Sequence, residues 1–334
     1  MDLKKVFIKG SCPKKVGGQA VLEGIMMKSE DRTSIVLRLP DKSLHIKTEK
    51  LPEQKKWTQI PFLRGIFVFV DSLVQGMKTL MYSADVLEEY EGEGALEDDR
   101  FSLWLEKKFG KKGAWNIMIY SSVVISVLFT VGVFIIAPTA AVSWLKHFTE
   151  SEVLLNLAEG VLRIVAFVLY VVLIARMEEI KKVFQYHGAE HKCIHCLETE
   201  KELTVENCRK YGTLHPRCGT SFLMFVFVIA LVLFSLLGWP DLLFRIISRI
   251  LLIPVIAGLS FELLKWAGRS DNWVVKILSI PGLLMQMITT KEPDDGQLQV
   301  AIAALKAATA KEGEFGQGAC DNQGKMIKEE EDVL

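Results

Sequence analysis

Long apolar runs occupy the middle of the chain, and charged residues gather towards its two ends. Residues 116–138 contain no charged side chain and are long enough to cross a bilayer as one helix. Three more apolar stretches of comparable character lie at residues 153–175, 221–237 and 242–264. The pattern therefore predicts four transmembrane helices.

The N-terminal region has a shorter, alternating pattern. Residues 33–39 and 44–48 flank Pro40-Asp41-Lys42, in which proline is well placed to start a turn, so they predict a β-hairpin. The preceding segment, residues 17–24, contains three glycines and is interpreted either as a plain turn or as a functional loop. Residues 62–84 place their polar side chains on one stripe of a helix, which favours an interfacial or packing helix over a span.

The C-terminal region predicts two further helices. Residues 273–288 form an amphipathic stretch that we expect to be broken at Pro281-Gly282 and to lie on the membrane or re-enter it. Residues 298–310 are alanine-rich and follow Pro293 and an acidic pair, which suits the start of a helix.

The sequence as a whole predicts a mostly α integral membrane protein with four transmembrane helices and a small β-containing cytoplasmic N-terminal region. The expected parts are the N-terminal region (1–60), an amphipathic helix and acidic linker (61–112), transmembrane helices 1 and 2 (113–175), a Cys/His loop (176–220), transmembrane helices 3 and 4 (221–266), amphipathic and C-terminal helices (267–310) and a disordered tail (311–334).

Composition and charge indicate the class of protein and its location in the cell. Hydrophobic residues make up 50% of the 334 residues, which excludes a disordered chain. The 40 basic and 40 acidic residues cancel, so bulk charge gives no indication of nucleic-acid binding. Basic residues concentrate before residue 116, in residues 176–220 and after residue 264, which predicts a multi-pass protein of the cell membrane with both termini and the long connector in the cytoplasm.

The connector carries the candidate chemistry. His187, Glu190 and His191 have the spacing His-x-x-Glu-His, so on a helix all three face one way. Two imidazoles one turn apart can bind one Zn²⁺, and the glutamate between them could take a proton from a water molecule. Since a reducing compartment favours metal ligands over disulfides, we expect a zinc site here.

The remaining ligands are left open by the spacing. Either His215 or Cys218, three residues apart across a proline, could supply the third ligand. Cys193 and Cys196 form a Cys-x-x-Cys pair that, with two histidines, would make a closed structural site. Two histidines and one cysteine would instead leave a fourth position for water, as catalytic sites do.

Charged residues inside the expected spans predict internal contacts. Glu159 and Arg163 are four residues apart and can pair on one helix face. Arg249 lies deep enough to meet Glu159. Glu262 falls at the cytoplasmic end of its span, where it could reach the histidine loop.

Several motifs together resemble the YqhQ-like family of bacterial membrane proteins, a family of unknown function that is described as metal-dependent by prediction. The resemblance covers nearly the whole chain up to about residue 306. The motifs that carry it are Gly17 to Gly24 with Met26-Met27, Arg64-Gly65, Tyr186 to Lys192, His215 to Phe222, and Thr289-Thr290 through Glu292-Pro293. The resemblance does not include Cys193 or His195. It implies functional roles for His187, Glu190, His191, Cys196, His215, Arg217 and Cys218.

Two functions follow from these observations. In the first, His187 and His191 hold zinc with Cys218 or His215, with Cys196 as a further candidate ligand, and Glu190 is the general base of a hydrolase. In the second, the Cys/His loop is a folded knuckle of a non-enzymatic scaffold that docks a cytoplasmic or membrane protein partner. The lipid bilayer is an expected partner in both.

Overall fold

The computed structural model describes most of the chain and divides it into two compact units. One unit comprises residues 1–87, 171–229 and 250–334, and the other comprises residues 88–170 and 230–249. The described residues are 6–8, 14, 16–52, 60, 63–91, 100–238, 242–267, 272–310 and 318–320.

The first unit contains an antiparallel sheet in which four N-terminal strands follow one another in chain order. These strands are β1 (Gly17–Val21), β2 (Gly24–Lys28), β3 (Arg32–Arg38) and β4 (Leu44–Lys50). The pairing of β3 with β4 confirms the predicted hairpin. Its turn is closed by the Leu39 amide, which donates to the carbonyl oxygen of Ser43 at 3.0 Å.

The glycine-rich segment 17–24 belongs to a second hairpin, in which residues 17–21 form a strand and the expected turn lies at Leu22 and Glu23. Strand β1 pairs with β2 from Gly17 opposite Lys28 to Val21 opposite Gly24. Glycine is required at position 24 because a Cβ there would lie 2.3 Å from the Val36 carbonyl oxygen of β3. Gly24 therefore serves close packing of strands.

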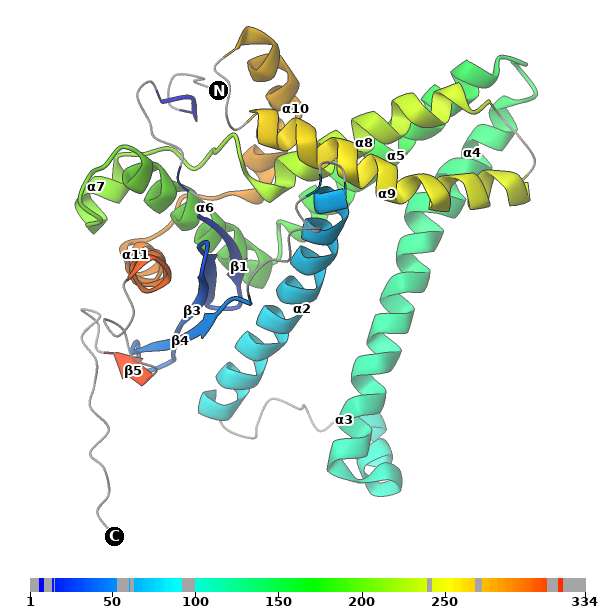
Figure 1. Cartoon of the computed structure of the whole chain (residues 1–334). Coiled ribbons are helices and arrows are strands. Elements are labelled where there is room, and N and C mark those ends of the chain that lie inside the picture. Colours follow the sequence, from blue (N-terminus) through cyan, green and yellow to red (C-terminus); the bar gives the residue numbers. More distant parts are fainter. Residues whose placement is uncertain are drawn as a thin grey trace, which may run out of the picture. The chain divides into compact units, whose positions relative to one another are not determined.

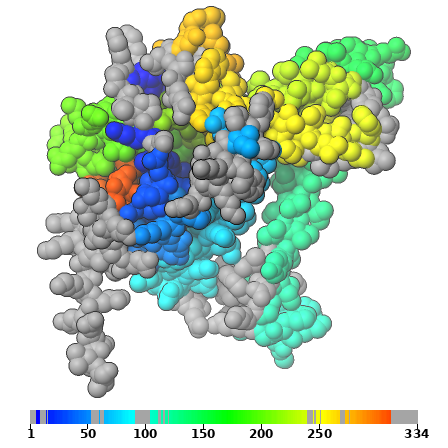
Figure 2. All heavy atoms as spheres, viewed as in Figure 1, coloured from blue at the N-terminus to red at the C-terminus, as the bar shows by residue number. Residues whose placement is uncertain are grey.

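Helices cover both faces of this sheet (Figure 1). Helices α6 (Glu178–Glu198) and α11 (Asp295–Thr309) pack on one face, and α2 (Leu63–Glu91) packs on the other. On the face shown in Figure 2, blue N-terminal atoms lie beside the green atoms of the segment that contains α6 and α7 (Val205–Arg209). The core around α6 and α11 includes Ile25, Met27, Val36, Leu44, Ile46, Tyr186, Ala189, Cys193, Leu298 and Leu305.

The C-terminal helices agree in part with the predictions. Helix α11 begins after Asp294, which forms a capping box with Gln297, as the acidic pair predicts. Helix α10 (Trp273–Thr289) was expected to break at Pro281 but continues through it. The proline removes one helical hydrogen bond, and burial of Leu283 and Met285 holds the following turn in place.

The regions expected to lack structure are described only in part. Of the predicted tail 311–334, residues 318–320 form a strand, β5 (Gly318–Cys320), which pairs with β4. The rest of that tail lies outside the described residues. Helix α2 includes the predicted amphipathic segment and extends into the acidic linker, of which residues 92–99 also lie outside the described part.

Four helical segments in the described chain are long and apolar enough to cross a membrane: Tyr120–Leu145, Glu152–Ile174, Gly219–Leu236 and Ile247–Trp266. They belong to α3 (Arg100–Val131), a π-helical turn η2 (Gly132–Ile136), α4 (Ala137–Leu145), α5 (Glu152–Ile174), α8 (Gly219–Leu236) and α9 (Leu242–Ala267). Only 6% of the first apolar window is buried within the protein, so most of its side chains are left to contact lipid. The protein is therefore a membrane protein.

Each unit contains an ion pair that involves its apolar helices. In the second unit Glu159 of α5 contacts Arg163 and accepts hydrogen bonds from Arg249 of α9 at 2.6 and 2.8 Å, as predicted. In the first unit Glu262 pairs with Arg64 of α2. Glu262 therefore has a partner on α2, and its contact with the histidine loop stays a prediction.

Candidate metal centre

Helix α6 carries the candidate residues on one face, because its other face packs against the sheet core. Tyr186, Ala189 and Cys193 are buried against the sheet at helical spacing. This packing turns the neighbouring face, which carries His187 and His191, towards the segments that follow α7 and α10. The fold therefore orients the histidines before any ligand is considered.

Gly188 lets the segment after α10 lie directly on this helix. A Cβ at Gly188 would stand 2.0 Å from the carbonyl oxygen of Lys291. The backbone amide of Lys291 donates to the Phe184 carbonyl at 2.9 Å. The close approach brings the end of α10 against the histidine face of α6.

Three ligand-type side chains converge here: His187, His191 and Cys218. One donor atom from each lies within 4.8 Å of the other two. The two imidazole rings are 4.4 Å apart between centroids, and His187 Nε2 is 3.1 Å from Cys218 Sγ. Cys218 belongs to the segment immediately before α8, so the group joins two stretches of the chain between which 26 residues lie, from 192 to 217.

The hydrogen bonds of the two rings define their tautomers. His187 Nδ1 lies 2.9 Å from the carbonyl oxygen of Thr289, and His191 Nδ1 lies 2.5 Å from that of Thr213. A carbonyl oxygen only accepts, so each Nδ1 carries a proton and each Nε2 keeps its lone pair. His191 Nε2 is buried without a hydrogen-bond partner among the described residues. Carbonyl groups that fix a histidine in this way are typical of metal ligands.

The surroundings of these side chains affect whether they carry the protons that a metal ion would have to displace. Burial lowers the pKa of His191 to about 4, which keeps the imidazole neutral at pH 7. Burial by itself would raise the pKa of the Cys218 thiol, and it is the charge of a protonated His191, with hydrogen bonds to Thr220, that outweighs burial and lowers it. The neutral imidazole is the form of histidine that binds zinc.

Glu190 lies beside this group on α6 and is almost fully buried, with 5% of its surface exposed. Burial raises the pKa of Glu190 to about 7, although His187 and a hydrogen bond from the Gly18 backbone amide act in the opposite direction. Its Oε2 atom has no hydrogen-bond partner among the described residues. A carboxyl group with a pKa near neutrality is suited to accept and release a proton.

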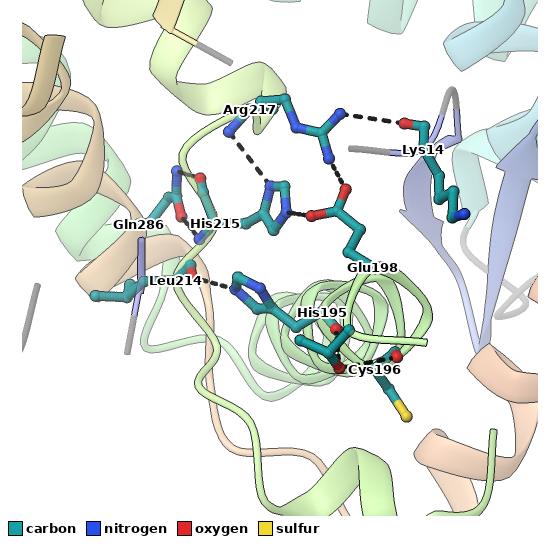
Figure 3. A network of polar contacts seen from close by, with 9 residues as sticks. Lys14, His195, Cys196, Glu198, Leu214, His215, Arg217 and Gln286 are labelled. Carbon is teal, nitrogen blue, oxygen red and sulfur yellow. Dashed lines mark hydrogen bonds and ion pairs between the residues drawn. The ribbon is translucent and has the colours of Figure 1, made fainter. Parts of the chain in front are cut away.

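A second group of donors lies farther along α6 and is drawn in Figure 3: His195, Glu198 and His215. The Arg217 guanidinium contacts the Glu198 carboxylate and also donates to the Lys14 carbonyl oxygen at 3.1 Å. The arginine therefore already compensates the buried carboxylate charge.

The tautomer of His215 also distinguishes the second group from the first. The backbone amide of Arg217 donates to His215 Nδ1 at 3.3 Å, so the neutral ring carries its proton on Nε2. That atom faces Glu198 Oε2 at 3.5 Å. The Arg217 amide therefore engages one ring nitrogen of His215, and the Arg217 guanidinium pairs with the Glu198 carboxylate, so the first group is the better metal centre.

The structure thus separates the residues that the sequence proposed together. His187, Glu190, His191 and Cys218 meet, whereas His215 lies beside them with its ring centroid 5.6 Å from that of His191. Cys196 is packed in the sheet core, where its Sγ lies 3.4 Å from the Glu202 carbonyl oxygen.

Gln286 of α10 is a contributor that the sequence did not reveal. Its side chain accepts from the His215 amide at 2.8 Å and donates to the His215 carbonyl at 2.9 Å and to Ser221 Oγ at 3.0 Å. These bonds hold both ends of the segment that carries Cys218. A single glutamine in an apolar helix gives no signal of this role in sequence.

Comparison with known proteins places the chain in a family. The family described as "Protein of unknown function (DUF1385)" matches residues 60–311. The chain belongs to the DUF1385 family. Among curated proteins, this DUF1385 protein is similar to "Uncharacterized protein YqhQ" of Bacillus subtilis (strain 168), with 35% identity over 305 residues that cover 89% of this chain and 93% of that one. No solved structure matches.

Proposed function

We propose that this membrane protein holds a divalent zinc ion with His187, His191 and Cys218 and uses it in hydrolysis. The observation that supports the ligand set is the direction of the lone pairs. Both histidines donate through Nδ1 to backbone carbonyls and direct the lone pair of Nε2 towards the cysteine sulfur. Three protein ligands leave a fourth position for water, which is the arrangement of catalytic zinc sites.

Zinc supplies one chemical effect when bound: it lowers the pKa of a water ligand to about 7. Glu190 supplies the matching base, because its carboxyl group lies next to the ligands. The charge balance is also favourable, since a thiolate and two neutral imidazoles leave a net positive charge that would hold Glu190 ionised.

The first experiment measures metal content. Full-length protein purified in detergent is expected to contain one zinc per chain by elemental analysis, and His191→Ala is expected to lose it. His147→Ala, which changes an exposed histidine, is the matched control and should retain the metal. A wild-type protein without metal after zinc loading would contradict the proposal.

The second experiment separates catalysis from a structural role. Glu190→Gln keeps the shape of the side chain but removes the base, so we expect metal content to persist and hydrolytic activity to fall by 10²-fold or more. The burial of Glu190 and Cys218, at 5% and 8% exposure, is the observation that favours the alternative of a structural knuckle in a membrane scaffold. A scaffold would tolerate Glu190→Gln without loss of cellular function.

A further inference from the structure

Strand β1 is an edge of the sheet and lies beside the candidate metal centre. It is the first strand in the sheet order, and in the described part of the chain its ladder partner is β2 alone. Gly17 and Gly18 are exposed at this edge. An open edge presents unpaired backbone groups to which another extended chain can bind.

The hairpin register shows which groups point outwards. The two-residue connection at Leu22 and Glu23 makes Val21 and Gly24 the pair that closes the turn. Bonded and non-bonded pairs alternate in an antiparallel ladder, so the pairs of Gln19 and Gly17 are bonded to β2 as well. The backbone groups of the two residues between them therefore point away from the sheet.

These two residues are Gly18 and Ala20. Among the residues that the structure describes, Ala20 has no backbone hydrogen bond outside the sheet ladder. The Gly18 amide reaches the Glu190 carboxylate. A Cβ at Gly18 would stand 2.8 Å from Glu190 Cδ, which fixes the distance between the edge and the proposed base. The edge therefore runs directly past Glu190.

We propose that the outer edge of β1 binds an extended polypeptide by strand addition, so that the substrate of this site is a peptide. The inference deepens the proposed hydrolase function and rests on it. Backbone hydrogen bonds to Ala20 would hold the peptide in register, and its neighbouring peptide bond would lie at Glu190.

The reaction at this position is peptide hydrolysis. The oxygen of a water molecule forms a bond to the carbonyl carbon while Glu190 accepts the water proton. The carbon–nitrogen bond then breaks, and Glu190 returns the proton to the leaving nitrogen. The products are a carboxylate and an amine, and no oxidant or reductant is required.

The test uses β-casein, an unfolded polypeptide, as the probe and the full-length Glu190→Gln protein in detergent as the receptor. Ala20→Pro removes the outward N–H without removing a bond to β2, and proline is tolerated at such edge positions. We expect Ala20→Pro to weaken casein binding at least fivefold in fluorescence anisotropy. Ala20→Ser keeps the N–H and is the control that should bind as before.

Hydrogen–deuterium exchange provides a second measurement that needs no edge variant. Casein should protect residues 17–21 from exchange, and the protection should not occur at the exposed hairpin turn around Asp41. Casein binding that is unchanged in Ala20→Pro, or exchange in residues 17–21 that casein does not slow, would overturn the inference. Zinc content is measured on the same samples, so failure of the metal site is seen separately from failure of the edge.

Discussion

At the scale of single residues, identity and spacing define a candidate, and the surroundings define its chemistry. His187, Glu190 and His191 can be recognised from the His-x-x-Glu-His spacing alone. Which ring nitrogen of each histidine carries the proton depends on the carbonyls of Thr289 and Thr213, which come from distant segments. No local pattern encodes those contacts, so the sequence left the third ligand open between His215 and Cys218.

Gly188 gives a prediction about close packing. Alanine would favour the helix by about 1 kcal/mol over glycine, but its Cβ would lie 2.0 Å from the Lys291 carbonyl oxygen. Overpacking of this kind costs about 1–3 kcal/mol. We therefore expect Gly188→Ala to lower the thermal unfolding midpoint of the purified protein.

Gly132→Ala is the matched control for this prediction, because a Cβ at Gly132 would meet nothing within 4 Å. It should leave the midpoint unchanged or raise it. If Gly188→Ala behaved like Gly132→Ala, the close contact between α6 and Lys291 would be contradicted.

His195 gives a prediction about pH. Burial, with a contribution from His215, lowers the pKa of His195 to about 3, whereas an unfolded histidine has a pKa near 6.5. The unfolded chain therefore binds a proton between these values that the folded protein does not bind. The stability due to the neutral ring is present above pH 6.5 and is lost as pH falls, by about 2 kcal/mol at pH 5.

The corresponding measurement is the unfolding midpoint of the purified protein between pH 7 and pH 5. It should fall with pH in the wild type and fall less steeply in His195→Gln. His147→Gln, at an exposed position, should keep the wild-type slope. Equal slopes in all three proteins would show that His195 is not buried in its neutral form.

At the scale of elements, the segment that carries Cys218 is held by a side chain of another helix. Gln286 satisfies both backbone groups of His215, which is itself buried. Gln286→Leu would leave a buried amide and a buried carbonyl without partners, and each costs about 1–3 kcal/mol. We expect this variant to lose at least about 2 kcal/mol of stability.

Met287→Leu changes the next residue of α10, whose side chain is 50% exposed, and is the matched control. Its denaturation midpoint should remain close to that of the wild type. A Gln286→Leu protein as stable as this control would show that the segment before α8 is held by other contacts.

The elements that the sequence predicted well have strong local signals. The apolar runs, the hairpin of β3 and β4 and the capped start of α11 are each encoded within a short window. The predictions that differ from the structure concern features that depend on tertiary packing. Helix α10 continues through Pro281 because buried residues follow it, and β1 lies close to β2 and α6 because Gly18 has no side chain.

At the scale of the whole molecule, the orientation in the membrane remains a prediction from basic residues. Residues 176–218 are expected inside the cell, and the short connection between α4 and α5 outside. We expect Lys146→Cys to react with a membrane-impermeant maleimide in intact cells. Lys201→Cys should react only after permeabilisation.

Both lysines are exposed, so accessibility in the folded protein is comparable. Each lysine substitution is introduced into a protein that also carries Cys12→Ser and Cys320→Ser. The four cysteines of the described connector can stay, because they are buried. Labelling of Lys201→Cys in intact cells would reverse the orientation and contradict a cytoplasmic location of the metal centre.

The sequence by itself determined the membrane class, the four apolar helices and the face of α6 that carries two histidines and a glutamate. These properties follow from hydrophobic length and helical periodicity, which are local. Only the tertiary structure decided that Cys218 meets those histidines, that His215 pairs with a different carboxylate, and that β1 passes Glu190. The reason is physical: ligand geometry depends on backbone segments that lie far apart in the chain and approach only when the sheet, α6 and α10 pack together.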